Sequence, residues 1–233
     1  DADDEASFVA GEIQRTLMAE SDSSVAVLYR TNAQSRLFEE ALRRLAIDYR
    51  VVGGFSFYER AEVKDLLAYA RLATNLKDSA SLLRVINTPP RSIGDTTVEL
   101  LQASARRGNL TLWEALEQEL AAKLLSARPL RVLEVFYNLI RELVAAREQM
   151  SMSGFFREIL DRTKYLEMLR GEGTPEAEGR IENLQELVNA AAEAGERGET
   201  LAEFLDHAAL VSDADAYDER ARVTLMTLHS AKG

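Results

Sequence analysis

Two apolar runs near opposite ends of the chain constrain its fold more than any other feature. Residues 25–29 read Val-Ala-Val-Leu-Tyr, and residues 223–228 read Val-Thr-Leu-Met-Thr-Leu. Short apolar runs with β-branched residues predict buried strands of a parallel sheet. A third, shorter strand is predicted at 49–52, just before two glycines. Because the last strand needs partners, and the other predicted strands lie before residue 58, we expect both ends of the chain to share one sheet.

The sequence between these strands is helical. Apolar residues at helical spacing predict helices over 1–20, around Leu37–Leu45 and over 61–76, so the first part alternates helix and strand as a parallel α/β sheet does. From 79 to 212 only helices are predicted, at 79–86, 95–106, 111–120, 129–149, 153–169, 177–194 and 200–212, followed by an acidic loop at 213–222. The predicted fold class is therefore α/β plus all-α: an incomplete parallel α/β unit interrupted by a large helical insertion.

We expect three segments: a first α/β part at 1–78, the helical insertion at 79–212, and a linker with the returning strand at 213–233. A sheet of two or three strands is a poor independent domain. We therefore expect the chain to be a piece of a longer protein.

Composition excludes several classes of protein. The 233 residues include no cysteine, which rules out a disulfide scaffold, a Cys-ligated zinc site and a thiol nucleophile. Two distant histidines make a poor metal site, so no metal site is expected. No apolar run approaches the ~20 residues of a membrane helix, and the acidic start does not resemble a signal peptide, so we expect a cytoplasmic protein without a membrane partner. The formal net charge of -11 means that any binding to nucleic acid must rest on local features.

Polar residues follow the two end strands, where parallel α/β sheets bind ligands. After the first strand, Tyr29 could stack on a nucleobase and Arg30 could place its guanidinium on a phosphate; a strand-end turn with a solvated arginine is the alternative. The last strand leads into Thr227-Leu228-His229-Ser230-Ala231-Lys232-Gly233. The chain contains no Gly-Lys pair and hence no Walker A loop, so we expect it not to hydrolyse a nucleoside triphosphate by that route.

Several linked segments resemble the UvrD/PcrA/Rep group of superfamily 1A DNA helicases. Val27–Arg36 is similar to helicase motif IV, Gly53–Asp65 to the motif that follows it, and Leu225–Gly233 to motif V. Within the helical part the resemblance continues at 85–89, 174–184 and 204–210. It covers nearly the whole chain, and several motifs in the right order are far more specific than any one alone.

The resemblance implies part of an ATP-dependent 3′-to-5′ DNA helicase of DNA repair or replication. The two ends would be half of the second RecA-like motor domain, 2A, and the helical insertion would be the accessory domain 2B, which binds duplex DNA and regulates unwinding. The Walker motifs would lie on missing motor domains, 1A and 1B. ATP with Mg²⁺ would bind the full-length protein, with no cofactor bound by this chain alone.

The same resemblance assigns roles to individual residues. Tyr29 would stack on adenine, and Arg30 would reach the γ-phosphate as an arginine finger. Thr227 and His229 would touch single-stranded DNA, while Lys232 and Gly233 would lie near the nucleotide; a solvated lysine is the alternative for Lys232. Two further cations, Arg60 and Lys64, are candidate single-strand phosphate contacts or simply a solvated helix face.

The segment Pro89–Thr97 is predicted to join two helices as a hairpin that holds duplex DNA by its phosphates. A helix N-terminus offers free N–H groups to anions, and Thr96–Glu99 fits a capping box. The candidate duplex contacts are Arg91, Ser92, Ile93, Gly94, Thr96 and Thr97. Members of the group usually carry Gly-Ile-Gly followed by Asp, a basic residue and Thr, so Ser92 and Thr96 depart from the pattern. Residues 84–107 hold four arginines and two acids, and we expect weak, salt-sensitive binding, with a purely structural turn as the alternative.

A function of another class also fits the helical part. Its apolar or acidic faces could dock repair or transcription proteins. The two functions differ in their response to salt, because binding to DNA weakens steeply as salt rises and an apolar protein interface does not.

Overall fold

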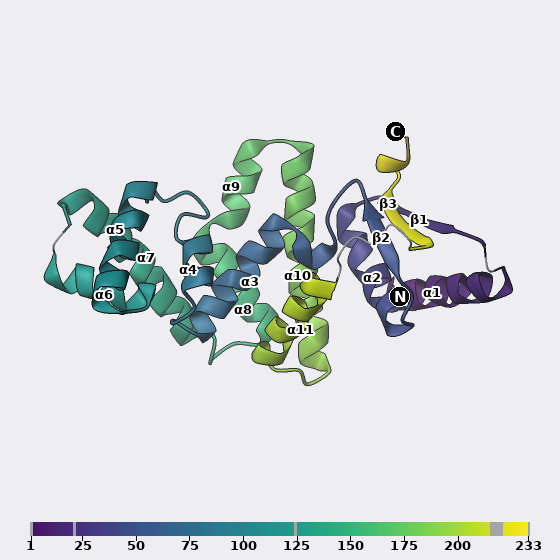
Figure 1. Cartoon of the computed structure of the whole chain (residues 1–233), viewed down its shortest axis with the longest axis horizontal. Coiled ribbons are helices and arrows are strands. Elements are labelled where there is room, and N and C mark those ends of the chain that lie inside the picture. The colour runs from purple at the N-terminus through teal and green to yellow at the C-terminus, as the bar shows by residue number, and fades with distance from the viewer. Residues whose placement is uncertain (1, 21, 124, 215–220, 233) are drawn as a thin grey trace. The chain divides into compact units, whose positions relative to one another are not determined.

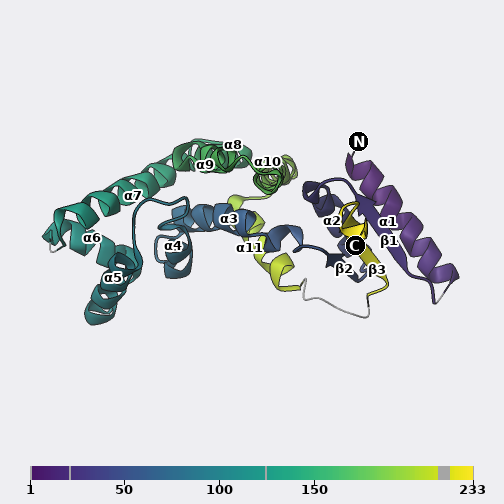
Figure 2. The same cartoon turned by 90° about the horizontal axis from the view of Figure 1, so that it is seen from above.

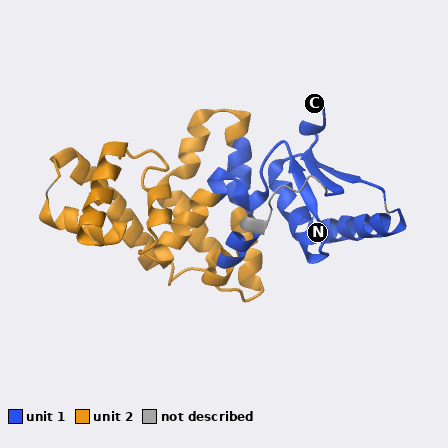
Figure 3. Ribbon diagram, viewed as in Figure 1, with its two compact units in different colours: residues 1–63, 178–186, 206–233 blue, residues 64–177, 187–205 orange. Residues whose placement is uncertain are grey.

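The computed structural model describes residues 2–20, 22–123, 125–214 and 221–232. These residues form two compact units, shown in Figure 3: 1–63, 178–186 and 206–233 make the first, and 64–177 with 187–205 make the second. The helices α3, α10 and α11 each contribute residues to both units. The division of the chain into segments 1–78, 79–212 and 213–233 stays a prediction.

The elements follow the predicted order (Figure 1). In chain order they are α1 (Ala2–Ala19), β1 (Val25–Tyr29), α2 (Ser35–Arg44), β2 (Tyr49–Val52), α3 (Ala61–Thr74), α4 (Ser79–Val85), α5 (Asp95–Gly108), α6 (Leu112–Ala122), α7 (Ala127–Ala146), α8 (Met152–Thr163), α9 (Tyr165–Glu172), α10 (Pro175–Glu196), α11 (Leu201–Ala214) and β3 (Val223–Thr227).

The first unit contains a parallel sheet of three strands in the order β1-β3-β2. Val223 aligns with Val25 on one side and with Tyr49 on the other, and Thr227 aligns with Tyr29. The prediction that the two ends of the chain share one sheet is therefore confirmed. The last strand of the chain lies between the two early ones, so β1 and β2 do not pair with each other.

The helices α1 and α2 pack together against this sheet (Figure 2). Their contacts with it form an apolar core listed here by element: Ala6, Ala10 and Ile13 of α1, Ala41 and Leu42 of α2, Tyr29 of β1, and Val223 and Leu225 of β3. Alternate residues of a strand point to opposite faces. Leu28, which precedes the buried Tyr29 in β1, is 48% exposed. The apolar run of β1 is therefore buried on one face only, whereas its composition predicts a fully buried strand.

All regular elements of the second unit are helices within its described residues, as predicted, but one predicted helix is divided in two. The segment 153–169, predicted as a single helix, is two helices, α8 and α9. They are separated at Lys164, which adopts a left-handed conformation with φ of 60°. The hydroxyl of the next residue, Tyr165, donates to Asp65 Oδ2 at 2.7 Å, so the break directs a buried tyrosine onto α3.

The acidic loop predicted at 213–222 is only partly visible. The helix α11 continues to Ala214, and residues 215–220 lie outside the described part of the chain. Among the described residues, no helix combines the length and the apolar character that crossing a membrane requires.

Candidate functional site

The three strands of the first unit end at one edge of the sheet, and a polar loop follows each of them. The loop after β1 carries Arg30, the loop after β2 carries Gly53, and the loop after β3 carries His229. The backbone N–H of Leu228 donates to the carbonyl oxygen of Tyr29 at 2.8 Å, which joins the first and last of these loops. Ligands of parallel α/β sheets bind at this edge. The structure thus brings together residues from both ends of the chain.

Gly53 and the loop after β3 approach each other closely. The φ of Gly53 is +79°, and a Cβ atom there would lie 2.2 Å from Ser230 Oγ and 2.8 Å from Ser230 Cβ. The hydroxyl of Thr227 is 3.0 Å from Ser230 Oγ and accepts from the Ser230 N–H at 3.1 Å. A glycine is required here both by the backbone conformation and by the space.

Thr227 and His229, predicted to contact single-stranded DNA, and Lys232, predicted to lie near a nucleotide, differ in exposure. Thr227 is half-buried, and its hydroxyl is engaged with Ser230, whereas His229 and Lys232 are exposed. Gly233, predicted to lie near a nucleotide, is outside the described residues. The exposed polar groups of this loop are therefore His229 and Lys232.

Arg30 is presented outward from a fixed backbone. Its own N–H and that of Thr31 donate to Gln34 Oε1 at 2.9 and 3.0 Å, which holds the turn that leaves β1. The side chain of Arg30 is exposed, and among the described residues its guanidinium makes no hydrogen bond or ion pair. An exposed guanidinium on a restrained backbone is well suited to contact a phosphate. Gln34 was not singled out from the sequence, where only its position three residues after Thr31 could have indicated the role.

Tyr29, the predicted adenine-stacking residue, belongs to the core of the first unit. It is 4% exposed and stacks on Phe38, with ring centroids 6.4 Å apart and planes inclined by 12°. Burial raises the pKa of its hydroxyl to about 12, and the negative charge of Glu39 adds to the increase. A stacking platform needs an accessible ring face, so adenine stacking by Tyr29 stays a prediction that this arrangement does not favour.

Arg60 and Lys64, predicted to contact single-strand phosphates or to lie on a solvated helix face, differ from each other in the structure. Arg60 is 6% exposed, and its guanidinium donates to four acceptors within the first unit, so it does not offer a surface contact to a nucleic acid. Burial lowers the pKa of Arg60, and Glu39 acts in the opposite direction. Lys64 is half-buried and belongs to the second unit. The helical spacing that grouped them on one surface face was misleading because Arg60 precedes α3 and turns inward.

The predicted hairpin between α4 and α5 is present in the second unit, but the side chain of Arg91 does not point to solvent. Its guanidinium donates to the carbonyl oxygens of Val85 and Pro89, each at 3.0 Å, and to the hydroxyl of Tyr69. It also lies over the rings of Tyr69 and Phe136, at 5.6 and 5.9 Å from their centroids. Arg91 therefore secures the base of the hairpin.

Ser92 and Gly94 at the tip of the hairpin are exposed, while Ile93 between them is 1% exposed and anchors the turn. Ser92 has φ of 61°, the left-handed conformation that favours glycine. The helix begins at Asp95 with Gly94 as its N-cap, so the capping box predicted at Thr96–Glu99 is wrong: Thr96 and Thr97 lie within the first turn.

Asn87 closes the hairpin, a role the sequence did not indicate. Its Oδ1 accepts from the N–H of Arg91 at 2.7 Å and from that of Ile93 at 3.3 Å. The arginines of this region are not gathered at the tip either. Arg84 pairs with Asp65 at 2.7 Å, and Arg106 and Arg107 lie in the last turn of α5, about 15–20 Å along the helix from its start.

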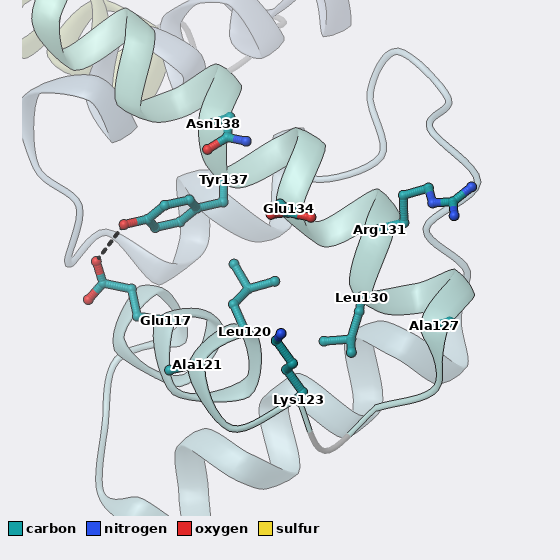
Figure 4. Close-up of a pocket in the computed structure, with 10 residues that line it drawn as sticks. All are labelled: Glu117, Leu120, Ala121, Lys123, Ala127, Leu130, Arg131, Glu134, Tyr137 and Asn138. Atoms are coloured by element: carbon teal, nitrogen blue, oxygen red, sulfur yellow. Dashed lines mark hydrogen bonds between the residues drawn. The ribbon is translucent and has the colours of Figure 1, made fainter.

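A separate pocket of about 560 Å³ lies between α6 and α7 of the second unit (Figure 4). Its lining mixes apolar and charged residues: Glu117, Leu120, Ala121, Lys123, Ala127, Leu130, Arg131, Glu134, Tyr137 and Asn138. The Tyr137 hydroxyl donates to Glu117 Oε1 at 3.3 Å across one side. No residue predicted from the sequence lines this pocket. Within the described ranges, no three His, Asp or Glu side chains are grouped so that they could hold a metal ion.

A parallel sheet with polar loops at its carboxyl edge, in a chain that also has a large helical part, defines an α/β protein of the class that binds ligands at that edge. Comparison with known proteins is more specific. The family profile of the UvrD-like helicase C-terminal domain matches residues 1–233, and the chain belongs to this family.

Individual relatives agree with this membership. The chain is 38% identical over 240 residues to the ATP-dependent DNA helicase PcrA of Bacillus subtilis, with 98% of the chain and 32% of the relative covered. It is 41% identical over 237 residues to DNA helicase II of Haemophilus influenzae, with 99% and 33% covered. The chain thus spans about a third of the length of the curated relatives it matches.

Proposed function

We propose that this chain is the 2A/2B portion of an ATP-dependent 3′-to-5′ DNA helicase that acts in DNA repair or replication. Residues 1–78 and 213–233 would be a share of motor domain 2A, and residues 79–212 would be the accessory domain 2B. The observation that carries the proposal is the parallel register between Val25–Tyr29 and Val223–Thr227, which places Arg30 and the loop after β3 at one ligand-binding edge. Membership of the helicase family and the names of the relatives support the activity.

ATP fits this edge only in part. The exposed guanidinium of Arg30 suits a terminal phosphate, where it would neutralise charge that develops during phosphoryl transfer. The chain has no Gly-Lys pair, so the motor domains 1A and 1B would hold the nucleotide and its Mg²⁺. Binding and cleavage of ATP therefore require parts that this chain does not supply, and Arg30 would act across the cleft between two motor domains.

Single-stranded DNA would run along the loop after β3. His229 is exposed there, and the hydroxyl of Thr227 contacts Ser230 and shapes the loop, while the exposed Lys232 would lie near the nucleotide. Lys64 remains a candidate from the second unit. We leave Arg60 out of the proposed contacts because its donors are committed inside the first unit.

ATPase and unwinding assays on the full-length protein, and an ATPase assay on the isolated chain, test the proposal. We expect the full-length protein to hydrolyse ATP faster when single-stranded DNA is present and to unwind duplexes with a 3′ overhang. The isolated chain should hydrolyse no ATP, because the phosphate loop is missing. Hydrolysis by the isolated chain, or a full-length protein indifferent to DNA, would contradict the proposal.

Duplex DNA would meet the second unit at the hairpin, through the backbone of Ser92 and Gly94 and the first turn of α5. Because the side chain of Arg91 is turned inward, we expect Arg91→Ala to lower the free energy of unfolding by about 2 kcal/mol, the value of lost hydrogen bonds to a charged group. The slope of log affinity for duplex DNA against log salt should stay unchanged. Urea unfolding and binding titrations at several salt concentrations measure the two quantities.

Arg107→Ala is the matched control, since Arg107 is exposed at the opposite end of α5. It should leave both stability and the binding at the hairpin unaltered. A loss of about 0.9 from the salt slope in Arg91→Ala would instead identify Arg91 as a phosphate contact.

Docking of a protein partner by the helical part is the second candidate function. The pocket between α6 and α7 favours it, together with Val135 of α7, which is 59% exposed. A partner held there mainly by apolar contacts would remain bound at salt concentrations that release DNA.

A further inference from the structure

A buried polar cluster lies behind the loop that carries Arg30, and Arg60 is at its centre. Arg60 Nη1 donates to the carbonyl oxygen of Asn32 at 2.8 Å, and Nη2 donates to Ser35 Oγ at 2.7 Å. Its Nε donates to the carbonyl oxygen of Phe55 at 3.3 Å. One guanidinium therefore holds the loop after β1 at Asn32, the start of α2 at Ser35 and the loop after β2 at Phe55.

The helix α10 supplies the remaining partner of this guanidinium. Arg60 Nη1 also donates to Asn183 Oδ1 at 2.8 Å, and Asn183 Nδ2 donates to Glu62 Oε1 at 2.6 Å. Asn183 is 4% exposed, and it belongs to residues 178–186, the part of α10 included in the first unit. Its amide thus fixes the position of Arg60 from one side and that of Glu62 from the other.

Two further contacts brace the same region. Arg36, which is 1% exposed, donates from Nε to Glu186 Oε1 at 2.7 Å and from Nη1 to Glu40 Oε1 at 3.1 Å. Both carboxylate oxygens of the fully buried Glu39 accept from the N–H of Phe57, at 3.1 and 3.2 Å. Buried charges are costly unless they are paired and hydrogen-bonded, so such a cluster is rigid when complete and loosens when one member is removed.

We propose that Asn183 and Arg60 are positioning residues, which hold the loop from Arg30 to Ser35 so that the Arg30 guanidinium is presented to the nucleotide. The inference rests on the proposed function, because it needs Arg30 to act on a phosphate. Asn183 comes from the helical insertion of the sequence, so the insertion supplies part of the support for the phosphate-contacting loop. A misplacement of a reacting group by about 1 Å costs on the order of 10²-fold in rate, which makes such support consequential.

The test is a double-mutant cycle in the full-length protein, read as the single-turnover rate of DNA-stimulated ATP hydrolysis. Asn183→Ala should lower this rate by about 10–100-fold, while the KM for ATP changes by less than about twofold. In an Arg30→Ala background the same substitution should have no further effect, because Asn183 acts through Arg30. Gln185→Ala, at an exposed position on the same helix, is the matched control and should keep the wild-type rate.

Each other outcome overturns the inference. An unchanged rate in Asn183→Ala, or an equal loss with and without Arg30, would show that Asn183 does not act through the loop. If Asn183→Ala does not fold, Asn183→Asp is used in the same cycle. It keeps an oxygen that accepts from Arg60 but replaces the amide donor to Glu62 by a carboxylate, so it should lower the rate when Arg30 is present and have no further effect when Arg30 is absent. If the wild-type protein shows no DNA-stimulated hydrolysis, both the proposed function and this inference are overturned. If the wild type is active but the effects of the Asn183 and Arg30 substitutions add, only the inference is overturned.

Discussion

Replacement of Arg30 by alanine in the full-length protein is expected to lower the rate constant for DNA-stimulated ATP hydrolysis by about 10³–10⁵-fold, the effect of losing an arginine finger. Such a group stabilises charge that develops on the transferred phosphoryl oxygens, so the loss should fall on kcat much more than on the KM for ATP. Stopped-flow measurement of phosphate release would follow the reaction across that range.

Two features of the structure sharpen this prediction. The side chain of Gln34 holds the turn after β1 through the backbone N–H groups of Arg30 and Thr31, so truncating the Arg30 side chain removes no hydrogen bond or ion pair within the described part of the chain. The free energy of unfolding should therefore stay the same. Arg15→Ala removes an exposed arginine from α1 of the same unit and should leave hydrolysis unaltered. A loss of less than about tenfold in Arg30→Ala would exclude Arg30 as the finger.

Gly53→Ala should destabilise the first unit by about 2–5 kcal/mol. A residue with a Cβ atom costs about 1–2 kcal/mol in the left-handed conformation, and overpacking adds about 1–3 kcal/mol. The second contribution is expected because the new methyl group would overlap Ser230, and the backbone there has little freedom to move while Thr227 holds the turn. Hydrogen exchange of the β3 amides as a function of urea measures the change in this unit.

Gly54→Ala provides the matched control for that substitution. The neighbouring glycine has no positive φ, and a Cβ atom there would meet nothing within 4 Å. It should change stability by less than about 0.5 kcal/mol, as surface substitutions usually do. Equal effects at the two positions would show that Gly53 is not needed for the close approach of the loops after β2 and β3.

Much of the architecture could be predicted because it follows from local pattern. The run Val25–Tyr29 and the run beginning at Val223 are apolar and β-branched, and a strand at the end of the chain has to pair with earlier ones. Helix ends were predicted less well where one residue decides them. The break at Lys164 and the position of the N-cap of α5 at Gly94 rather than at Thr96 depend on how the adjoining residues pack.

The arginines of the candidate sites show the limit of such prediction. In the sequence, Arg30, Arg60 and Arg91 are three similar cations beside turns. Tertiary contacts distinguish them. Arg60 donates a hydrogen bond to Asn183, 123 positions away along the chain, and Arg91 donates one to Tyr69, 22 positions away. Only Arg30 of the three is left exposed.

The sequence by itself determined which segments are strands and helices and that the last strand joins the sheet of the first. The reason is that the spacing of apolar residues within a short segment differs between a helix and a strand. Only the tertiary structure decided which polar groups face solvent and which brace the interior. The physical reason is that a guanidinium can leave water only where enough acceptors converge on it, and distant parts of the chain supply those acceptors.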